Sequence, residues 1–224
     1  MTEVVDWGRR EYPPALEAMR ELVRARRAGT IGDTLVLVEH PAVVTVGVEG
    51  DDGSAEASGL PVVRVERGGH ATYHGPGQLV GYPIVDLDRR GRDVRHFVHD
   101  LEEVVIRTLD AFGLRGTHVG GRRGVWVDGE RKVASIGIAV DHWVTFHGFA
   151  LNVSVDLAEF RRIRPCGFDG SVMTSISREL GRTVPLTEVR TPLLRAWEAV
   201  FPSEPPRGAR ASEPARPPGA PSAA

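Results

Sequence analysis

The chain has 224 residues, of which 41% are hydrophobic and 26% charged, and its formal net charge is −2. These values are typical of one globular domain with a single core, and the lack of a basic excess argues against a nucleic-acid-binding protein. No segment approaches the roughly 20 apolar residues of a membrane span. Because the first residues carry an early acid and the single cysteine cannot form an internal disulfide, we expect a cytoplasmic protein.

Apolar periodicity in the first half of the chain predicts one helix followed by several strands. Apolar residues recur at helical spacing within 14–27, and Ala28-Gly29 follows them. Runs rich in β-branched residues then predict strands at 34–38, 43–46, 62–66 and 79–87.

The second half contains the clearest helical pattern, a single apolar stripe between 93 and 112 that ends at Gly113. A turn at Asp128-Gly129 between apolar runs at 124–127 and 132–140 predicts a β-hairpin. Further predicted elements are a strand at 144–153, a short helix at 156–162 and a last helix at 186–201. Since strands and helices mix without strict alternation, the expected fold class is α/β or α+β, with a mixed β-sheet flanked by helices.

The composition changes sharply at the C-terminus. Residues 202–224 contain 7 of the 16 prolines, together with Ala, Ser and Arg. Such a segment cannot bury enough apolar surface to fold. We therefore expect residues 1–201 to form the catalytic domain and 202–224 to be a disordered tail.

Lysine occurs only once. Of the 28 basic residues 27 are arginine, and the exception is Lys132. A lysine can lose its proton when it is desolvated, whereas arginine stays charged. With a period of two, Lys132 would share an apolar strand face with Ala134 and Ile136, where an amine is costly unless it is neutral or partnered. The alternative is a surface lysine retained by chance.

Cysteine also occurs only once, at Cys166, in a turn that follows Arg161, Arg162 and Arg164. Nearby positive charge favours the thiolate form, so this environment indicates a reactive cysteine. The alternative is an inert, buried thiol.

The densest polar segment is RGGHATYHGPGQ at 67–78. Its glycines allow close approach of the backbone to a ligand, and polar side chains between two apolar strands are typical of a pocket lip. A glycine-rich hairpin with a hydrogen-bonded histidine remains the alternative. The segment lacks the Gly-Lys-Ser/Thr of a phosphate loop. His70 and His74 have no second pair of residues at ligand spacing, so no metal site is expected.

Together, four segments resemble the lipoyl(octanoyl) transferase family: RGGHATYHGPGQL at 67–79, KVASIG at 132–137, FHGFALNV at 146–153 and PCG at 165–167. The resemblance covers about residues 35–179. It implies the fold of the biotin and lipoate protein ligases. It also implies an enzyme of lipoate biosynthesis that moves an octanoyl group to a target lysine.

The resemblance implies a site as well. Cys166 matches the family's nucleophile, which takes the octanoyl group as a thioester, and Lys132 matches the lysine paired with it. The matching acyl-substrate contacts are Arg67, Gly68, Gly69, His70, Ala71, Thr72, Tyr73, His74, Ser135, Ile136, Gly137, Gly148, Phe149 and Ala150. The implied donor is octanoyl-acyl carrier protein. The implied acceptors are the lipoyl domains of 2-oxoacid dehydrogenase complexes and the glycine cleavage H protein, with no cofactor, nucleic acid or membrane.

Three alternatives stay open from the residues alone. An ATP-dependent lipoate–protein ligase of the same fold would not require Cys166. A non-catalytic acyl-carrier-binding module would not require both Lys132 and Cys166. A thioesterase would use water in place of the acceptor lysine.

The tail gives the first testable prediction. Deletion of residues 203–224 should leave both the melting temperature and the transfer rate nearly unchanged, because this segment is too poor in apolar residues to pack on a domain. Differential scanning calorimetry of the full and shortened chains measures the effect. A drop of many degrees would show that the tail packs on the domain.

Overall fold

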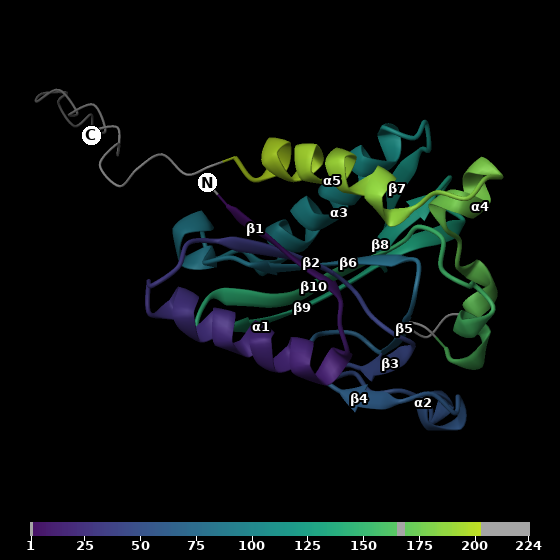
Figure 1. Ribbon diagram of the computed structural model, residues 1–224, viewed down its shortest axis with the longest axis horizontal. Helices are drawn as coiled ribbons and strands as arrows, with labels where there is room; N and C mark the ends of the chain where they lie inside the picture. Colours follow the sequence, from purple (N-terminus) through teal and green to yellow (C-terminus); the bar gives the residue numbers. More distant parts are fainter. Residues whose placement is uncertain (1, 165–168, 203–224) are drawn as a thin grey trace, which may run out of the picture.

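The computed structural model describes residues 2–164 and 169–202. Cys166 and nearly all of the predicted tail lie outside these ranges. A seven-stranded sheet in the order β1-β2-β6-β10-β9-β8-β7 runs through the molecule (Figure 1). Its strands are β1 Glu3–Arg9, β2 Thr34–Glu39, β6 Gln78–Ile84, β7 Gly116–Val119, β8 Arg122–Val127, β9 Arg131–Asp141 and β10 Val144–Asn152. β1 and β2 are parallel and the other neighbours are antiparallel, so the sheet is mixed.

A second, three-stranded sheet has the order β4-β3-β5. It consists of β3 Val43–Val46, β4 Val62–Arg64 and β5 Ala71–His74, with β3 parallel to β4 and antiparallel to β5. Short helices pack beside it: α2 Ser54–Ala57 and the 3₁₀ turns η2 Glu159–Arg162 and η4 Gly170–Val172. Their apolar side chains form a small separate core that contains Phe160 and Met173.

The long helices cover the two faces of the large sheet (Figure 1). α1 Tyr12–Arg27, with proline in its first turn, packs on one face through Leu16, Met19 and Val23. α3 Val94–Asp110 and α5 Leu186–Val200 pack on the other face and against each other. Asp93 accepts a hydrogen bond from the His96 amide and so caps the start of α3. α4 Ile176–Leu180 and the 3₁₀ turn η1 Leu87–Arg90 complete the elements.

The predicted fold class and the three long helices are confirmed, and most strands lie within one or two residues of their predicted limits. The strand predicted at 79–87 ends earlier, because Asp86 accepts a hydrogen bond from the Asp88 amide and starts η1. The helix predicted at 156–162 is reduced to one four-residue 3₁₀ turn. β1, β5 and β7 were not predicted, and each is short or lacks a clear alternation.

The prediction for the face of Lys132 was wrong. Trp126 of β8 pairs with Lys132, whereas the residue before it, Val125, pairs with Ala134. Val133 therefore has no partner on β8 and is an extra residue in β9. This bulge breaks the alternation: Val133 and Ala134 both enter the core beneath α3 and α5. Lys132 therefore lies with its cross-strand partner Trp126 on the opposite face, and its Nζ is 5.7 Å from the centre of the indole ring.

None of the helices in the described parts of the chain combines the length and apolar character needed to cross a membrane.

Candidate functional site

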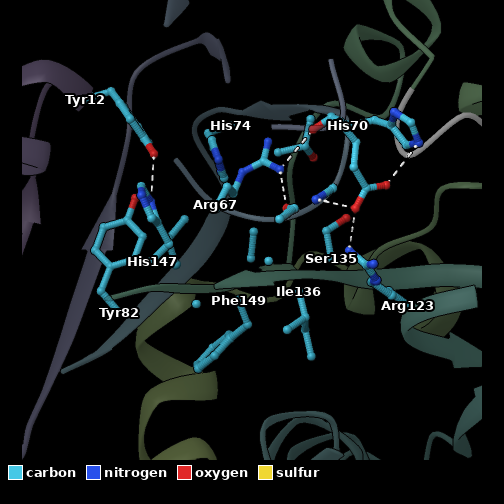
Figure 2. A pocket seen from close by; sticks show the side chains of 18 of the residues that line it. Tyr12, Arg67, His70, His74, Tyr82, Arg123, Ser135, Ile136, His147 and Phe149 are labelled. Atoms are coloured by element: carbon cyan, nitrogen blue, oxygen red, sulfur yellow. Dashed lines mark hydrogen bonds and ion pairs between the residues drawn. The ribbon is translucent and has the colours of Figure 1, made fainter. Parts of the chain in front are cut away.

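A cavity of about 230 Å³ lies between the α1 face of the large sheet and the loop that precedes β5 (Figure 2). Strands β6, β9 and β10 form its floor, the segment from Arg67 to His74 forms its roof, and Tyr12 of α1 reaches its edge. Val80 and Ala150 supply apolar side chains on the α1 face, whereas the side chains of Ile136 and Phe149 point away from the slot into the core beneath α3 and α5 (Figure 2). The cavity is thus a narrow slot between two sheets.

Twelve of the fourteen substrate contacts implied by the sequence line this slot. The other two are Ala71 and Tyr73, which alternate with Thr72 and His74 along β5 and point into the small core, where Tyr73 packs against Phe160. The tertiary structure therefore brings together segments from residue 67 to residue 150 of the chain.

Glycines set the width of the slot. A Cβ atom at Gly137 would lie 2.8 Å from the carbonyl oxygen of Gly68, and one at Gly148 would collide with the carbonyl oxygen of Gly81. Only a residue without a side chain allows these backbones to approach each other so closely. The residue before Gly148, His147, has a φ of 56°, a left-handed conformation inside a strand that is found mostly at functional sites.

Arg67 shapes the roof of the slot. Its guanidinium, which is 7% exposed, donates to the carbonyl oxygens of Gly68 at 3.1 Å and His70 at 2.9 Å. It also donates to the carbonyl oxygen of Thr45 at 2.8 Å and to its hydroxyl at 2.9 Å. Arg67 thus holds the glycine-rich loop in a fixed shape through hydrogen bonds to its own backbone.

From Thr45 a line of buried hydrogen bonds continues across the domain. The hydroxyl of Thr45 lies 3.3 Å from Nε2 of His74, and Nδ1 of His74 lies 2.8 Å from Oε1 of Gln78. Gln78 Nε2 donates to Oδ1 of Asn152 at 2.9 Å, and Asn152 Nδ2 donates to the carbonyl oxygen of Thr174 at 3.0 Å. Because the amide oxygen of Gln78 only accepts, His74 must carry its proton on Nδ1. Each group in the line then donates to the next one, from Arg67 to the carbonyl oxygen of Thr174. We call it the Arg67–Thr174 chain.

The Arg67–Thr174 chain ends beside Lys132. The amide of Thr174 donates to the carbonyl oxygen of Lys132 at 2.9 Å, and Met173 forms a parallel bridge with the same residue. Lys132 is 1% exposed. The hydrogen bonds therefore fix the backbone of Lys132 relative to the roof of the slot.

Burial keeps the histidines of this region neutral. Desolvation lowers the pKa of His74 to about 3, with a smaller effect from the neighbouring His40. Desolvation also lowers the pKa of His40 to about 4. His40 lies 2.7 Å from the carbonyl oxygen of Arg10 and 2.8 Å from the hydroxyl of Tyr82, so both ring nitrogens are hydrogen-bonded.

One end of the slot contains Tyr12 and His147 (Figure 2). The hydroxyl of Tyr12 lies 3.4 Å from Nδ1 of His147. Burial raises the pKa of Tyr12 to about 12 and lowers the pKa of His147. Glu66 lies 3.8 Å from Nε2 of His147, and this histidine lowers the pKa of Glu66 to about 2. At the edge of this end the ionised Glu66 also forms an ion pair with Arg20 at 3.0 Å.

The other end of the slot is lined by Glu49, by His70 of the glycine-rich loop and by Arg123 of β8 (Figure 2). One carboxylate oxygen of Glu49 accepts from Arg123 at 2.9 Å and from the amide of Gly69 at 3.0 Å. His70 lies 3.4 Å from the other oxygen. The charges of Arg123, followed by those hydrogen bonds, keep the pKa of Glu49 below its usual range despite slight burial. Glu49 thus ties the β7–β8 hairpin to the glycine-rich loop.

The predicted nucleophile, Cys166, falls outside the described residues. The chain on either side of it is well anchored: the amide of Arg164 donates to Ser54 at 3.2 Å, and Gly170 packs against the backbone of Phe160. Three residues after Gly170, Met173 reaches Lys132. The chain that follows residues 165–168 thus returns to the strand of Lys132.

Sequence reasoning missed several residues that line the slot: Tyr12, Glu49, Tyr82, Gly121, Arg123 and His147. His147 lies within the family-like segment FHGFALNV at 146–153, so its position beside Gly148 was an available signal. Tyr12 and Arg123 carry no comparable local pattern. As for metals, the parts of the chain that the structure describes contain no group of three His, Cys, Asp or Glu residues arranged to hold an ion.

The neutral histidines predict an acid-sensitive fold. His40 and His74 stay unprotonated when folded but bind a proton near pH 6.5 when unfolded, so their contribution is complete above that pH and is lost as pH falls below it. Between pH 7.5 and 5.5 each should lower the free energy of unfolding by about 1.4 kcal/mol. Urea unfolding at the two pH values measures this loss.

The variant His40→Gln should lose about 1.4 kcal/mol less between the two pH values than the wild type. His96, whose side chain is 68% exposed on α3, supplies the matched control His96→Gln, which should keep the wild-type pH dependence. An unchanged pH dependence in His40→Gln would contradict the prediction.

Comparison with known proteins places the chain in a family. Residues 11–198 match the model of the lipoyl protein ligase A/B catalytic domain. The chain is 49% identical to an octanoyltransferase of Geobacter metallireducens over 83% of its own length and 86% of the relative's. It is 46% identical to an octanoyltransferase of Rhodospirillum rubrum, with 85% of this chain and 90% of the relative covered.

Solved structures agree on the fold. A lipoate-protein ligase A bound with ATP superimposes with a TM-score of 0.69 at 17% identity, covering 89% of this chain and 85% of that one. The apo biotin protein ligase of Aquifex aeolicus superimposes with a TM-score of 0.53 at 11% identity, covering 89% and 69%. At these identities the likeness concerns the fold alone.

Proposed function

The chain belongs to the lipoyl protein ligase A/B catalytic-domain family, and on that premise we propose that it is an octanoyltransferase acting through a cysteine thioester. The donor is octanoyl-acyl carrier protein, and the acceptor is a lysine of a lipoyl domain or of the glycine cleavage H protein. The observation that carries this proposal is a slot lined by twelve family-type contact residues, among them Ser135, which lies three residues after Lys132 on β9.

The slot suits a straight acyl chain. Val80 and Ala150, which pair across β6 and β10, place apolar side chains on the α1 face of the sheet, and the glycines at 137 and 148 leave the floor without side chains. The polar groups around it are already bonded to one another through the Arg67–Thr174 chain and its neighbours. A methylene chain can therefore enter without leaving most of those groups unpaired.

In the first step the Cys166 thiolate attacks the carbonyl carbon of the donor thioester. A carbon–sulfur bond to Cys166 forms and the one to the carrier's thiol breaks, so one thioester replaces another at little cost in free energy. Lys132 accepts the proton of the Cys166 thiol and then returns it to the departing carrier thiolate.

In the second step the amine of the acceptor lysine attacks the acyl-enzyme. A carbon–nitrogen bond forms, the bond to Cys166 breaks, and the proton of the amine passes through Lys132 to the released thiolate. Because an amide is more stable than a thioester, this step is downhill and needs no ATP. An ATP-dependent ligase of this fold would instead activate the free acid and would not load Cys166.

The intact mass of the protein tests the proposal. Mixed with octanoyl-acyl carrier protein in the absence of ATP, the wild type should gain the mass of one octanoyl group, and Cys166→Ala should not. Addition of a lipoyl domain should then discharge the enzyme and load the domain. A wild type that gains no mass, or an enzyme that only hydrolyses the donor, would contradict a transferase.

Lys132 supplies a sharper prediction. We expect Lys132→Arg to be nearly as damaging as Lys132→Ala, with acylation slower by about 10²-fold or more, because a permanent cation cannot accept the thiol proton. In both variants the pH profile of Cys166 alkylation should shift to higher pH. If Lys132 acted only as a positive charge, the arginine variant would keep low-pH alkylation and most of its turnover.

A hollow beside η2 and η4 predicts where the acyl carrier protein, a generally acidic partner, binds. Arg161 and Arg178 line it together with Ser171. Arg162 instead pairs with Glu159 at 2.8 Å. Charge reversal of both Arg161 and Arg178 should raise the donor KM more than it lowers kcat. The difference in donor KM between this variant and the wild type should shrink at high salt.

The matched control reverses Arg95 and Arg195, which are exposed on α3 and α5 and produce the same change in net charge. This double variant should leave the donor KM near its wild-type value. Equal effects of the two double variants would show that net charge alone, rather than this hollow, governs carrier binding.

A further inference from the structure

Resting on the proposed function, we propose that Ser135 is the hydrogen-bond donor to the carbonyl oxygen of the acyl thioester. On this assignment it stabilises the oxyanion of the tetrahedral intermediates in both transfer steps. It is thus a catalytic residue and not only part of the wall of the slot.

The hydroxyl of Ser135 is buried in the slot without a partner. The residue is 9% exposed, and its Oγ makes no hydrogen bond to any residue in the described ranges. A buried, unpaired hydroxyl costs about 1–3 kcal/mol, and native proteins retain few of them. Since Ser135 lines the cavity, a ligand oxygen is the group that would satisfy it.

Three other polar side chains that line the slot already contact protein groups. Arg67 makes four hydrogen bonds to protein oxygens. Arg123 pairs with Glu49, and His70 contacts the same carboxylate and the carbonyl oxygen of Gly50. Ser135 differs from them because its buried hydroxyl makes no such contact.

Two amides of the glycine-rich loop also have partners. The amide of Gly68 donates to the carbonyl oxygen of Ile138 at 2.9 Å, and that of Gly69 donates to Glu49 at 3.0 Å. A second unpaired polar atom in the slot is Nε2 of His147, but it lies at the opposite end, near Tyr12 (Figure 2). Among the described residues that line the slot, Ser135 combines an unpaired donor with a position on β9, the strand of Lys132.

The position of Ser135 follows from β9. Ser135 lies three residues after Lys132 on the same strand, and the bulge at Val133 places both on the face away from α3 and α5. Ser135 pairs with Ala150 of β10, another residue that lines the slot. The carbonyl group of a bound acyl chain would lie at the Ser135 end, with its tail directed toward Tyr12.

Hydrogen-bond donation here favours the transition state. When a thiolate or amine adds to the carbonyl carbon, the electron pair of the double bond moves to the oxygen, and the charge makes its bond to Ser135 stronger. No proton is transferred from Ser135, and collapse of the intermediate restores the carbonyl. The contact should therefore affect the rate more than the binding of the donor.

The test compares Ser135→Ala with the wild type in two reactions of Cys166. Single-turnover acylation by octanoyl-acyl carrier protein should slow by about 10²-fold, the effect of losing one oxyanion donor, with little change in donor KM. Alkylation of Cys166 by iodoacetamide should keep its wild-type rate and pH profile, because displacement of iodide forms no oxyanion. The melting temperature should stay constant or rise, since the removed hydroxyl has no partner in the free protein.

The matched control is Thr108→Val, which removes a buried hydroxyl bonded at 2.7 Å to the carbonyl oxygen of Val104 in α3. It should lower the melting temperature and leave acylation unchanged. Wild-type acylation in Ser135→Ala, or a parallel loss of acylation and alkylation, overturns the assignment. Failure of the wild type to form the acyl-enzyme would refute the proposed function instead.

Discussion

The Arg67–Thr174 chain is the constraint on which the site depends. It passes through β3, β5, β6 and β10 and so joins the small sheet to the large one before it reaches the backbone of Lys132. Each member has its donor and acceptor roles fixed by its neighbours, and the loss of one would leave the next unpaired at a cost of about 1–3 kcal/mol. This network fixes the small sheet relative to the large one and holds the backbone of Lys132 in place.

Burial also explains why two histidines and a tyrosine of the site are uncharged. His40 and His74 are neutral because burial opposes their protonation, and Tyr12 keeps its proton for the same reason. Almost every polar group around the slot is bonded to protein. Unpaired groups are then informative, since a pocket arranged in advance leaves open the positions that substrate atoms will occupy.

The backbone of β10 is strained where it passes the slot. The left-handed conformation of His147 and the close approach at Gly148 let β10 pass beneath Pro83 and Gly81 while the histidine turns toward Tyr12. Strain of this kind persists only where the surrounding packing enforces it. The amide of His147 meets the sulfur of Met19 at 3.2 Å, so α1 helps to hold that conformation.

The sequence by itself determined the fold class, the long helices, the hairpin before β10 and the segments that line the slot, because apolar periodicity, turn residues and short motifs are local properties. Only the tertiary structure decided which face of β9 carries Lys132. The bulge at Val133 arises from pairing with β8, and no alternation pattern reveals an extra residue on one strand. Likewise, the roles of Tyr12 and Asn152 depend on partners more than 70 residues away, and such contacts exist only once the chain has folded.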